Sequence, residues 1–280
     1  MKCKTYKKNI LIKFLYNTAA GRFLLQPLCS RGFSNTCGKF LDTSLSRHLI
    51  PVFIKSQKIS LEECEKTDFQ SFNDFFTRKL KSETRPLPQD PKAPFAPCDG
   101  FLSAYRITNR LVIPVKQSLY SISDLLNEDP LHRRFKDGIC LVFRLCVNHY
   151  HRYLYIDGGV KGDNVFIPGA LHTVRPIALD RYPVFIQNCR EYTVMKTDSF
   201  GTAIQVEVGA MLVGKICNHH NAGVIRRGDE KGMFLYGGST VILLLQKDSV
   251  SVDEHFFAAT ESGLELPVKM GQSIGKSLHP

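Results

Sequence analysis

The sequence predicts an α+β protein in which N-terminal amphipathic helices precede a mainly antiparallel β core. Apolar residues recur at helical spacing in the first 66 residues, a proline-rich run follows, and short β-prone runs punctuated by glycine fill the rest. With 280 residues, 43% of them hydrophobic and 22% charged, the chain has the size and composition of a globular protein that buries a large core.

Three segments of the N-terminal part have the periodicity of helices, namely residues 8–30, 42–66 and 69–80. Five prolines then lie in the run from Arg85 to Pro97. This run is expected to be extended, because proline fixes its own φ and disfavours a helical residue before it. We place the main boundary here and expect a helical region over 1–85 and a β-rich domain over 86–280.

The predicted strands recur at short intervals with few long helical patterns between them, which indicates an antiparallel β domain. They cover residues 101–107, 111–115, 139–147, 152–156, 192–196, 203–208, 211–217 and 240–246. One short helix is expected at 119–126. The polar stretches 218–221 and 226–231 are expected to be loops.

Most of the net charge of +11 lies near the N-terminus. Residues 1–41 hold eight Lys and Arg residues and no Asp or Glu, which leaves 29 basic against 26 acidic side chains in the remainder. The apolar residues between them suit the surface of an anionic membrane, whereas Lys13 and Arg22 interrupt any apolar span. A basic helix that caps the core, or a mitochondrial transit peptide, has a similar composition. Because no nucleic-acid motif accompanies the charge, we do not expect a nucleic-acid partner.

Nine cysteines are scattered along the chain without a Cys-x-x-Cys pair. This usage is typical of reduced thiols rather than of a disulfide framework or a zinc knuckle. His149 and His151 would share one face of a strand, but no acidic or cysteine side chain completes a ligand set. We therefore predict no metal site.

Gly238 and Ser239 precede a long apolar, β-prone run, so a hydroxyl follows a glycine carbonyl at the start of a strand. A turn is the ordinary explanation of such a sequence. Asp99 and His151 supply the groups that activate a serine, because an imidazole takes the hydroxyl proton and a carboxylate orients the imidazole. The chain has no glycine two positions after Ser239, and a strand rather than a helix follows, unlike the Gly-x-Ser-x-Gly elbow of hydrolases. These residues favour attack of Ser239 on its own preceding peptide bond.

Short motifs follow one another along the chain: FNDFFTRKL at 72–80 with Arg85-Pro86, PCDG at 97–100, VK at 115–116 with Tyr120-Ser121 and Leu125-Leu126, YHR at 150–152, VGAMLVG at 208–214, GGST at 237–240 and VKMG at 268–271. In this order they closely resemble the phosphatidylserine decarboxylase family, of the bacterial soluble-proenzyme kind. The resemblance covers nearly all of the chain.

The resemblance implies a self-processing enzyme whose cofactor is a pyruvoyl group. Ser239 would attack the Gly238 carbonyl, and β-elimination would then cut the chain into residues 1–238 and 239–280. Ser239 would become the pyruvoyl group, form a Schiff base with phosphatidylserine and accept the electron pair left by carbon dioxide. His151 would protonate the carbanion to give phosphatidylethanolamine.

The resemblance also makes 86–280 the catalytic domain and 1–85 the membrane-associating region. The protein would be peripheral, at the cytoplasmic face of the cell membrane, with an anionic membrane surface as its partner. A homodimer is left open.

One position departs from the family pattern Tyr-His-Arg-x-His, whose second histidine is assigned to an Asp-His-Ser relay. This chain has Leu154 there, which cannot take a proton. Three explanations follow: His151 serves both steps, another histidine such as His172 substitutes, or the chain does not mature. We expect the first two, because Gly238-Ser239 is intact.

Two other functions stay open. One is a related pyruvoyl decarboxylase that acts on another amino acid or aminoacyl lipid. The other is an uncleaved, non-catalytic lipid-binding homologue, which Leu154 motivates.

Overall fold

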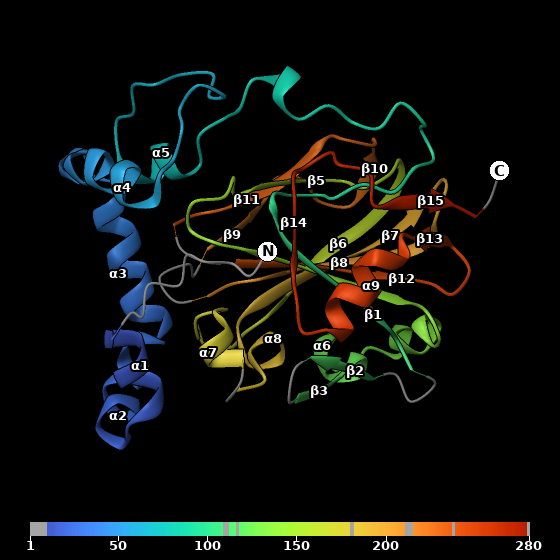
Figure 1. Cartoon of the computed structure of the whole chain (residues 1–280), viewed down its shortest axis with the longest axis horizontal. Helices are drawn as coiled ribbons and strands as arrows, with labels where there is room; N and C mark the ends of the chain where they lie inside the picture. Colours follow the sequence, from blue (N-terminus) through green and yellow to red (C-terminus); the bar gives the residue numbers. More distant parts are fainter. Residues whose placement is uncertain are drawn as a thin grey trace.

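An eight-stranded antiparallel sheet runs through the centre of the computed structural model, which describes residues 10–108, 112–115, 118–179, 182–210, 215–236 and 239–278 (Figure 1). The strand order is β10-β6-β7-β8-β12-β4-β1-β14. In chain order the strands are β1 (Gly100–Arg106), β4 (Ile139–Leu145), β6 (Gly159–Ile167), β7 (Arg190–Thr197), β8 (Gly201–Val208), β10 (Gly223–Ile225), β12 (Ser239–Leu245) and β14 (Leu266–Val268). With the helices that precede it, this sheet confirms the predicted α+β class.

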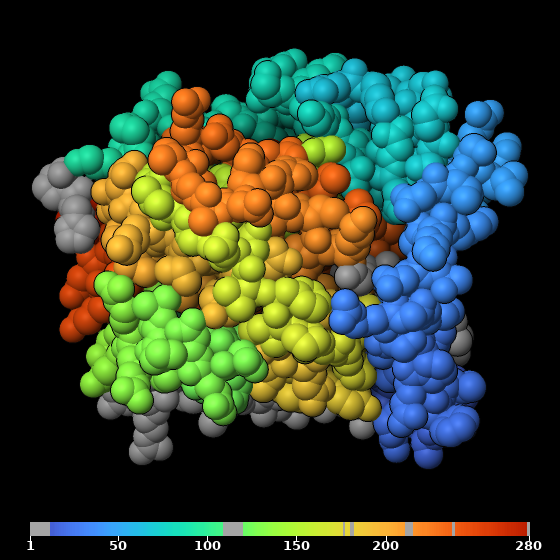
Figure 2. Space-filling view, turned by 180° about the vertical axis from the view of Figure 1, so that it is seen from behind, coloured from blue at the N-terminus to red at the C-terminus, as the bar shows by residue number. Residues whose placement is uncertain are grey.

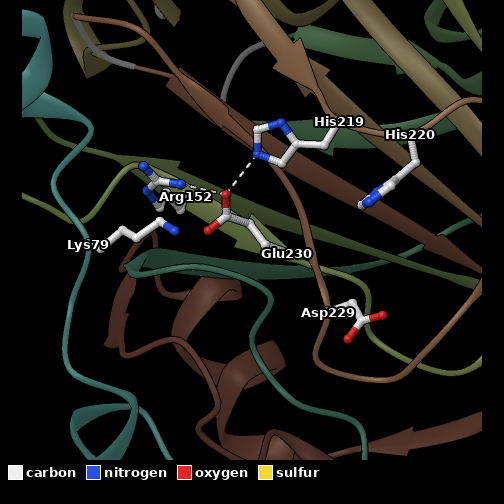
Figure 3. A pocket seen from close by; sticks show the side chains of 6 residues that line it. All are labelled: Lys79, Arg152, His219, His220, Asp229 and Glu230. Carbon is white, nitrogen blue, oxygen red and sulfur yellow. Dashed lines mark hydrogen bonds and ion pairs between the residues drawn. The ribbon is translucent and has the colours of Figure 1, made fainter.

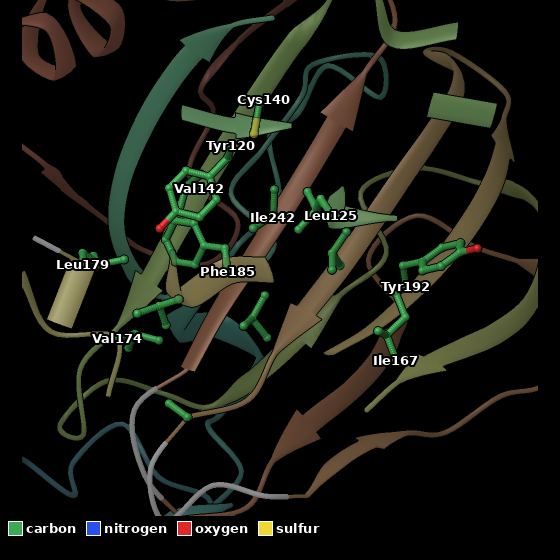
Figure 4. Packing of buried hydrophobic residues seen from close by; sticks show 14 of the residues in the cluster. Tyr120, Leu125, Cys140, Val142, Ile167, Val174, Leu179, Phe185, Tyr192 and Ile242 are labelled. Atoms are coloured by element: carbon green, nitrogen blue, oxygen red, sulfur yellow. The ribbon is translucent and has the colours of Figure 1, made fainter. Parts of the chain in front are cut away.

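The central strand β12 is buried at every residue, which explains its apolar sequence from Val241 to Leu245. Its even-numbered side chains, such as Ile242, belong to a helix-side core (Figure 4). This core includes residues of α1 (Ile10–Asn17), α2 (Ala19–Leu28), α6 (Ile122–Leu125), α7 (Pro176–Leu179) and α8 (Val184–Gln187).

Its odd-numbered side chains, such as Val241, belong to a second core, here called the strand-side core. A three-stranded sheet covers it in the order β5-β11-β9, formed by β5 (Arg152–Leu154), β9 (Ile216–Asn218) and β11 (Glu230–Phe234). The helix α9 (Glu254–Glu261) and the pair β13 (Val250–Val252) and β15 (Gly275–Ser277) complete the cover. The two faces of β12 therefore meet different surroundings.

The N-terminal helices form a column along one side of the molecule (Figure 2). After α1 and α2 come α3 (Arg31–Leu41), a 3₁₀ turn (Ser44–Leu49), α4 (Ile50–Gln57) and α5 (Phe72–Phe76). None of the helices in the described ranges has the length and apolar character needed to cross a bilayer.

Several predicted helix boundaries were wrong. The helix expected over 8–30 is broken where the Thr18 side chain caps α2 by accepting a hydrogen bond from the Gly21 amide. The helix expected over 42–66 ends at Gln57, because Lys58 adopts the left-handed conformation with φ 55°. The helix α3 was not predicted, since its glycines disfavour a helix and its polar residues make the segment weakly hydrophobic.

Several strand boundaries also differ. The helix expected at 119–126 is divided between the strand β3 (Ser118–Ser121), which pairs with β2 (Val112–Val115), and the helix α6. The strands β6 and β11 were not predicted, because glycine and charged residues fill their sequences. Of the strand predicted at 211–217, residues 211–214 lie outside the described residues. The run from Arg85 to Pro97 forms no helix or strand, and Phe95 makes an isolated bridge to Ser273. Contrary to the prediction, it is not extended throughout, because a turn at Pro91 and Lys92 is closed by a hydrogen bond from the Ala93 amide to the Asp90 carbonyl.

Candidate active site

Ser239 is the first residue of β12, and its side chain is fully buried. Alternation along the strand places it on the same face as Val241, toward the strand-side core. Its Oγ has no hydrogen-bond partner among the residues that the structure describes. Buried hydroxyls in proteins are normally hydrogen-bonded, so this exception points to a functional serine. The predicted residue Gly238 lies outside the described residues.

His151 lies directly before β5 and is fully buried. Its Nδ1–H donates to the carbonyl oxygen of His149 at 2.9 Å. In a neutral imidazole this bond fixes the tautomer and makes Nε2 the nitrogen that accepts a proton. The His151 carbonyl accepts a hydrogen bond from the Phe234 amide, which joins it to β11 over the strand-side core. His151 and Ser239 therefore lie on the same side of the large sheet.

An aromatic cluster ties the N-terminal helices to this site. It consists of Phe53 on α4, Phe72, Phe75 and Phe76 on α5, and Tyr236, three residues before Ser239. The Tyr236 ring packs edge-on against Phe72 and Phe76, with centroids 4.9 and 5.1 Å apart. Phe76 also packs against the His151 ring at 4.2 Å. The 72–80 motif thus positions the segment before Ser239 and the imidazole together.

Asp99 is engaged by a guanidinium and a backbone amide. Arg85 donates to its two oxygens at 2.9 and 2.8 Å, and the Met270 amide donates at 2.8 Å. Burial lowers the pKa of Arg85, but the hydrogen bonds and charges of Asp99 and Glu63 have a larger combined effect. The pKa of Arg85 is therefore raised. The structure thus ties together three of the sequence motifs, at 85–86, 97–100 and 268–271.

Leu154 lies at the end of β5 and packs with Phe95, Tyr150 and Met270. The backbone amide of Met270 also donates a hydrogen bond to Asp99. The position at which the family pattern has its second histidine is therefore an apolar site next to Asp99. Its leucine supplies packing where a proton acceptor was expected.

His172 lies with the helix-side core. Its Nδ1 is 3.5 Å from both the Tyr16 hydroxyl and the Cys29 thiol, and its ring stacks on Tyr182 at 4.6 Å. Burial lowers the pKa of His172. Since Ser239 points to the opposite face of the sheet, the structure does not bring these two predicted residues together.

His149 is held by the turn after β4, where the Cys146 amide donates to its Nδ1 at 3.1 Å. Burial and the nearby Arg144 lower the pKa of His149 to about 4, although Asp99 opposes the change. The His149 ring is therefore neutral at pH 7.

Each of the eight cysteines in the described part of the chain is free of disulfide bonds.

Sequence reasoning missed a buried polar group between the two sheets. Lys231, in a predicted loop, lies on β11 and donates to Glu207 of β8 at 2.8 Å, and both side chains are fully buried. The only sequence signal is an acidic residue inside the apolar run of β8. A charge in the middle of a buried strand is costly without a partner, so its presence already indicates one.

The surface pocket shown in Figure 3 lies on the outer side of the three-stranded sheet. Glu230 accepts from Arg152 at 2.5 Å and from His219 at 2.7 Å. Arg152 also donates to the Thr77 carbonyl, directly after α5. The arginine of the 150–152 motif thus fixes α5, and with it the aromatic cluster, to β5.

Comparison with known proteins identifies close relatives. A sequence model of the family described as phosphatidylserine decarboxylase matches residues 72–276. A phosphatidylserine decarboxylase proenzyme 2 of Clostridium acetobutylicum is 44% identical over 271 residues, which cover 96% of this chain and 93% of the relative. The phosphatidylserine decarboxylase proenzymes of Clostridium botulinum (strain Hall) and Clostridium beijerinckii are 40% and 36% identical, covering 94% and 97% of this chain and 92% and 96% of the relatives.

Proposed function

Because this chain belongs to the phosphatidylserine decarboxylase family, we propose that it cuts its own backbone before Ser239 and then decarboxylates phosphatidylserine to phosphatidylethanolamine. The reaction class, a carboxy-lyase, is that of the family. The observation that carries the proposal is the Ser239 Oγ, fully buried at a strand start and without a hydrogen-bond partner in the described ranges.

The first step is an acyl shift. Nε2 of His151 takes the Ser239 hydroxyl proton as Oγ adds to the Gly238 carbonyl carbon. The C–N bond then breaks, the nitrogen gains a proton, and an ester replaces the amide. Loss of the Cα proton of residue 239 next expels Gly238 as a carboxylate and leaves dehydroalanine. Water adds, ammonia leaves, and residue 239 becomes the pyruvoyl group.

The residues around Ser239 fit this group. The position is buried and anchored in a central strand, so a carbonyl made there would be rigidly placed. The pyruvoyl group supplies an electrophilic carbonyl that takes up the electron pair released with carbon dioxide. His151 is the residue that we assign to return a proton to the substrate carbon.

We assign the relay base to His151 rather than to His172. His151 shares the face of Ser239, and its Nδ1–H bond to the His149 carbonyl leaves Nε2 as the basic nitrogen. We assign Asp99 an indirect role, since it holds Arg85 and the Met270 amide. Leu154 packs beside Met270, so this segment stabilises the site without a second imidazole.

We also propose that the protein binds peripherally to anionic membranes through residues 10–58, at the cytoplasmic face. Phe23 is 74% exposed, and Leu45 and Val52 are each 70% exposed. Between Thr43 and Ser60 the sequence has basic residues and no acidic ones. Exposed apolar groups among basic residues suit an anionic lipid surface. The division at residues 85 and 86, and a homodimer, stay predictions.

Intact mass spectrometry tests the proposed function. A mature sample should contain chains of residues 1–238 and 239–280, the shorter one lighter by one ammonia than a chain beginning with serine. Radiolabelled phosphatidylserine in vesicles should then release carbon dioxide. A single uncut chain with an unmodified Ser239 after prolonged incubation would refute the proposal.

A further inference from the structure

A polar row lies beside Ser239 on the strand-side face of the large sheet. In the pairing of β8 with β12, Glu207 is opposite Val241, and Val208 is opposite Thr240. Ser239 precedes Val241 by two residues, so its side chain points to the same face as that of Glu207. Diagonal neighbours of this kind have Cα atoms about 7–8 Å apart, within reach of a long side chain.

The two carboxylate oxygens of Glu207 have different surroundings. Oε2 accepts from the Lys231 Nζ at 2.8 Å and from the Asn218 Nδ2 at 3.2 Å. Oε1 is buried and has no hydrogen-bond partner among the described residues. Lys231 is itself held by the Asn218 Oδ1 at 2.8 Å. The ion pair therefore fixes Glu207 by one oxygen and leaves the other as an acceptor.

Other buried polar atoms on this face also have no hydrogen-bond partner among the described residues. Both side-chain amide atoms of Gln205, two residues before Glu207 on the same face, lack a partner within the described ranges, as does the Ser239 Oγ. A buried acceptor without a donor is destabilising, so several together at one place need a reason. An ammonium group offers three hydrogen-bond donors and a positive charge, which a carboxylate oxygen binds well.

We propose that Oε1 of Glu207 binds the ammonium group of the amine substrate and orients its nitrogen toward residue 239. This inference rests on the proposed function, because the substrate amine must reach the carbonyl at that residue. Lys231 is a positioning residue, which holds Oε2 so that Oε1 faces the substrate. Binding the charged amine at a fixed carboxylate would select primary amines over neutral analogues.

The test compares two amines on the self-cut protein. Glycerophosphoserine carries the ammonium group, whereas hydroxylamine is uncharged at neutral pH and does not require a carboxylate. Glycerophosphoserine is coupled to the N-terminal carbonyl with sodium cyanoborohydride, and the labelled short chain is followed by intact mass. We expect Glu207→Gln to slow labelling by glycerophosphoserine about tenfold or more and to leave the hydroxylamine reaction unchanged.

Glu191→Gln is the matched control. Glu191 lies opposite Glu207 on β7, one strand further from Ser239, and accepts from the same Asn218 Nδ2 at 2.8 Å. This variant should label like the wild type with both amines. Equal slowing by Glu191→Gln and Glu207→Gln would show a general effect of removing a carboxylate bound to Asn218 and would overturn the inference.

A double variant, Glu207→Gln with Lys231→Met, removes both charges and avoids an unpaired lysine if the single variant is unstable. It should show the same selective loss. The assignment of Glu207 would be overturned if glycerophosphoserine labelled either variant at the wild-type rate. It would also be overturned if labelling by hydroxylamine slowed to the same extent as labelling by glycerophosphoserine. A wild-type protein without any hydroxylamine adduct would instead refute the proposed function, and the inference with it.

Discussion

Ser239 and Thr240 are adjacent hydroxyls on β12 that point to opposite faces of the sheet. Both are fully buried, and neither has a hydrogen-bond partner among the residues described. We expect Ser239→Ala to abolish self-cleavage, because only the Ser239 Oγ belongs to the residue that directly follows the Gly238 carbonyl. Thr240→Val, which removes the other hydroxyl with little change of shape, should still cleave. Both are read by denaturing gel and intact mass, and cleavage of Ser239→Ala would contradict the mechanism.

His151 and His172 offer a second comparison at the scale of single residues. We expect His151→Gln to slow self-cleavage by about 100-fold or more, the usual effect of removing a general base. His172→Gln should cleave close to the wild-type rate, because that ring contacts Tyr16 and Cys29 on the other face. Time courses of freshly refolded protein would measure both. The reverse order of effects would assign the relay to His172.

The sequence singled out Ser239, Asp99 and His151 as candidates, since each lies in a motif, and their roles stay predictions. It did not indicate that Asp99 is bound by Arg85, because the two residues are 14 positions apart along a proline-rich run whose path the sequence does not specify. The pair Glu207 and Lys231 was also missed. Their approach depends on how the three-stranded sheet packs on the larger one, which local sequence does not specify.

At the scale of elements, His149 in the turn after β4 should make the free energy of unfolding depend on pH. Burial lowers the pKa of His149 to about 4 in the folded chain, against 6.5 for the ordinary group. Between these values the unfolded chain binds more protons, so stability rises with pH. Lowering the pH through this range should therefore reduce the free energy of unfolding by about 1–3 kcal/mol, through the titration of His149.

His149→Asn tests this dependence, because the asparagine Oδ1 can accept the Cys146 amide without titrating. Urea unfolding at pH 7.5 and pH 5 should show a smaller loss of stability in the variant than in the wild type. An equal loss in both proteins would mean that His149 does not titrate as described.

The helix α4 contacts the aromatic cluster through Phe53, and Ile50 and Ile54 of the same helix pack beside it. Phe53 packs edge-on against Phe72, Phe75 and Tyr236 at 5.1, 6.1 and 6.2 Å. Since this ring is partly exposed, we expect Phe53→Ala to reduce the free energy of unfolding by about 2–3 kcal/mol, below the range for fully buried phenylalanine. The neighbouring Val52→Ala should change it by less than about 0.5 kcal/mol. Urea denaturation measures both, and similar effects would show that α4 is not anchored through Phe53.

At the scale of elements, β12 and α4 illustrate what a pattern can reveal. The apolar run of β12 is long and uninterrupted, so this strand was predicted. The end of α4 was not, because amphipathic spacing continues after Lys58 although the backbone there turns left-handed. The strand β6 was missed because Lys161, which is buried, donates to the carbonyls of His220 and Asn221 far along the chain.

For the whole molecule, the N-terminal column sets the expected orientation on a membrane. We expect the double variant Leu45→Ser with Val52→Ser to weaken binding to phosphatidylserine-containing vesicles by about tenfold or more, because each apolar side chain contributes about 1.5–3 kcal/mol when buried. Added salt should weaken binding of the wild type. Co-sedimentation measures both effects.

Val224→Ser is the control for this experiment. Val224 is 82% exposed on β10, at the opposite end of the sheet from α4 (Figure 1). Its loss should leave vesicle binding unchanged. If it weakens binding as much as the double variant does, the membrane contacts a different face.

The strand order has a consequence for the cut protein. The segment that begins at Ser239 supplies β12 in the middle of the large sheet and β14 at its edge. Without that segment the sheet would fall into two parts, β10-β6-β7-β8 and β4-β1. The two products are therefore interleaved as an obligate heterodimer, which should melt in one cooperative transition, and exchange of the small subunit between molecules should require global unfolding.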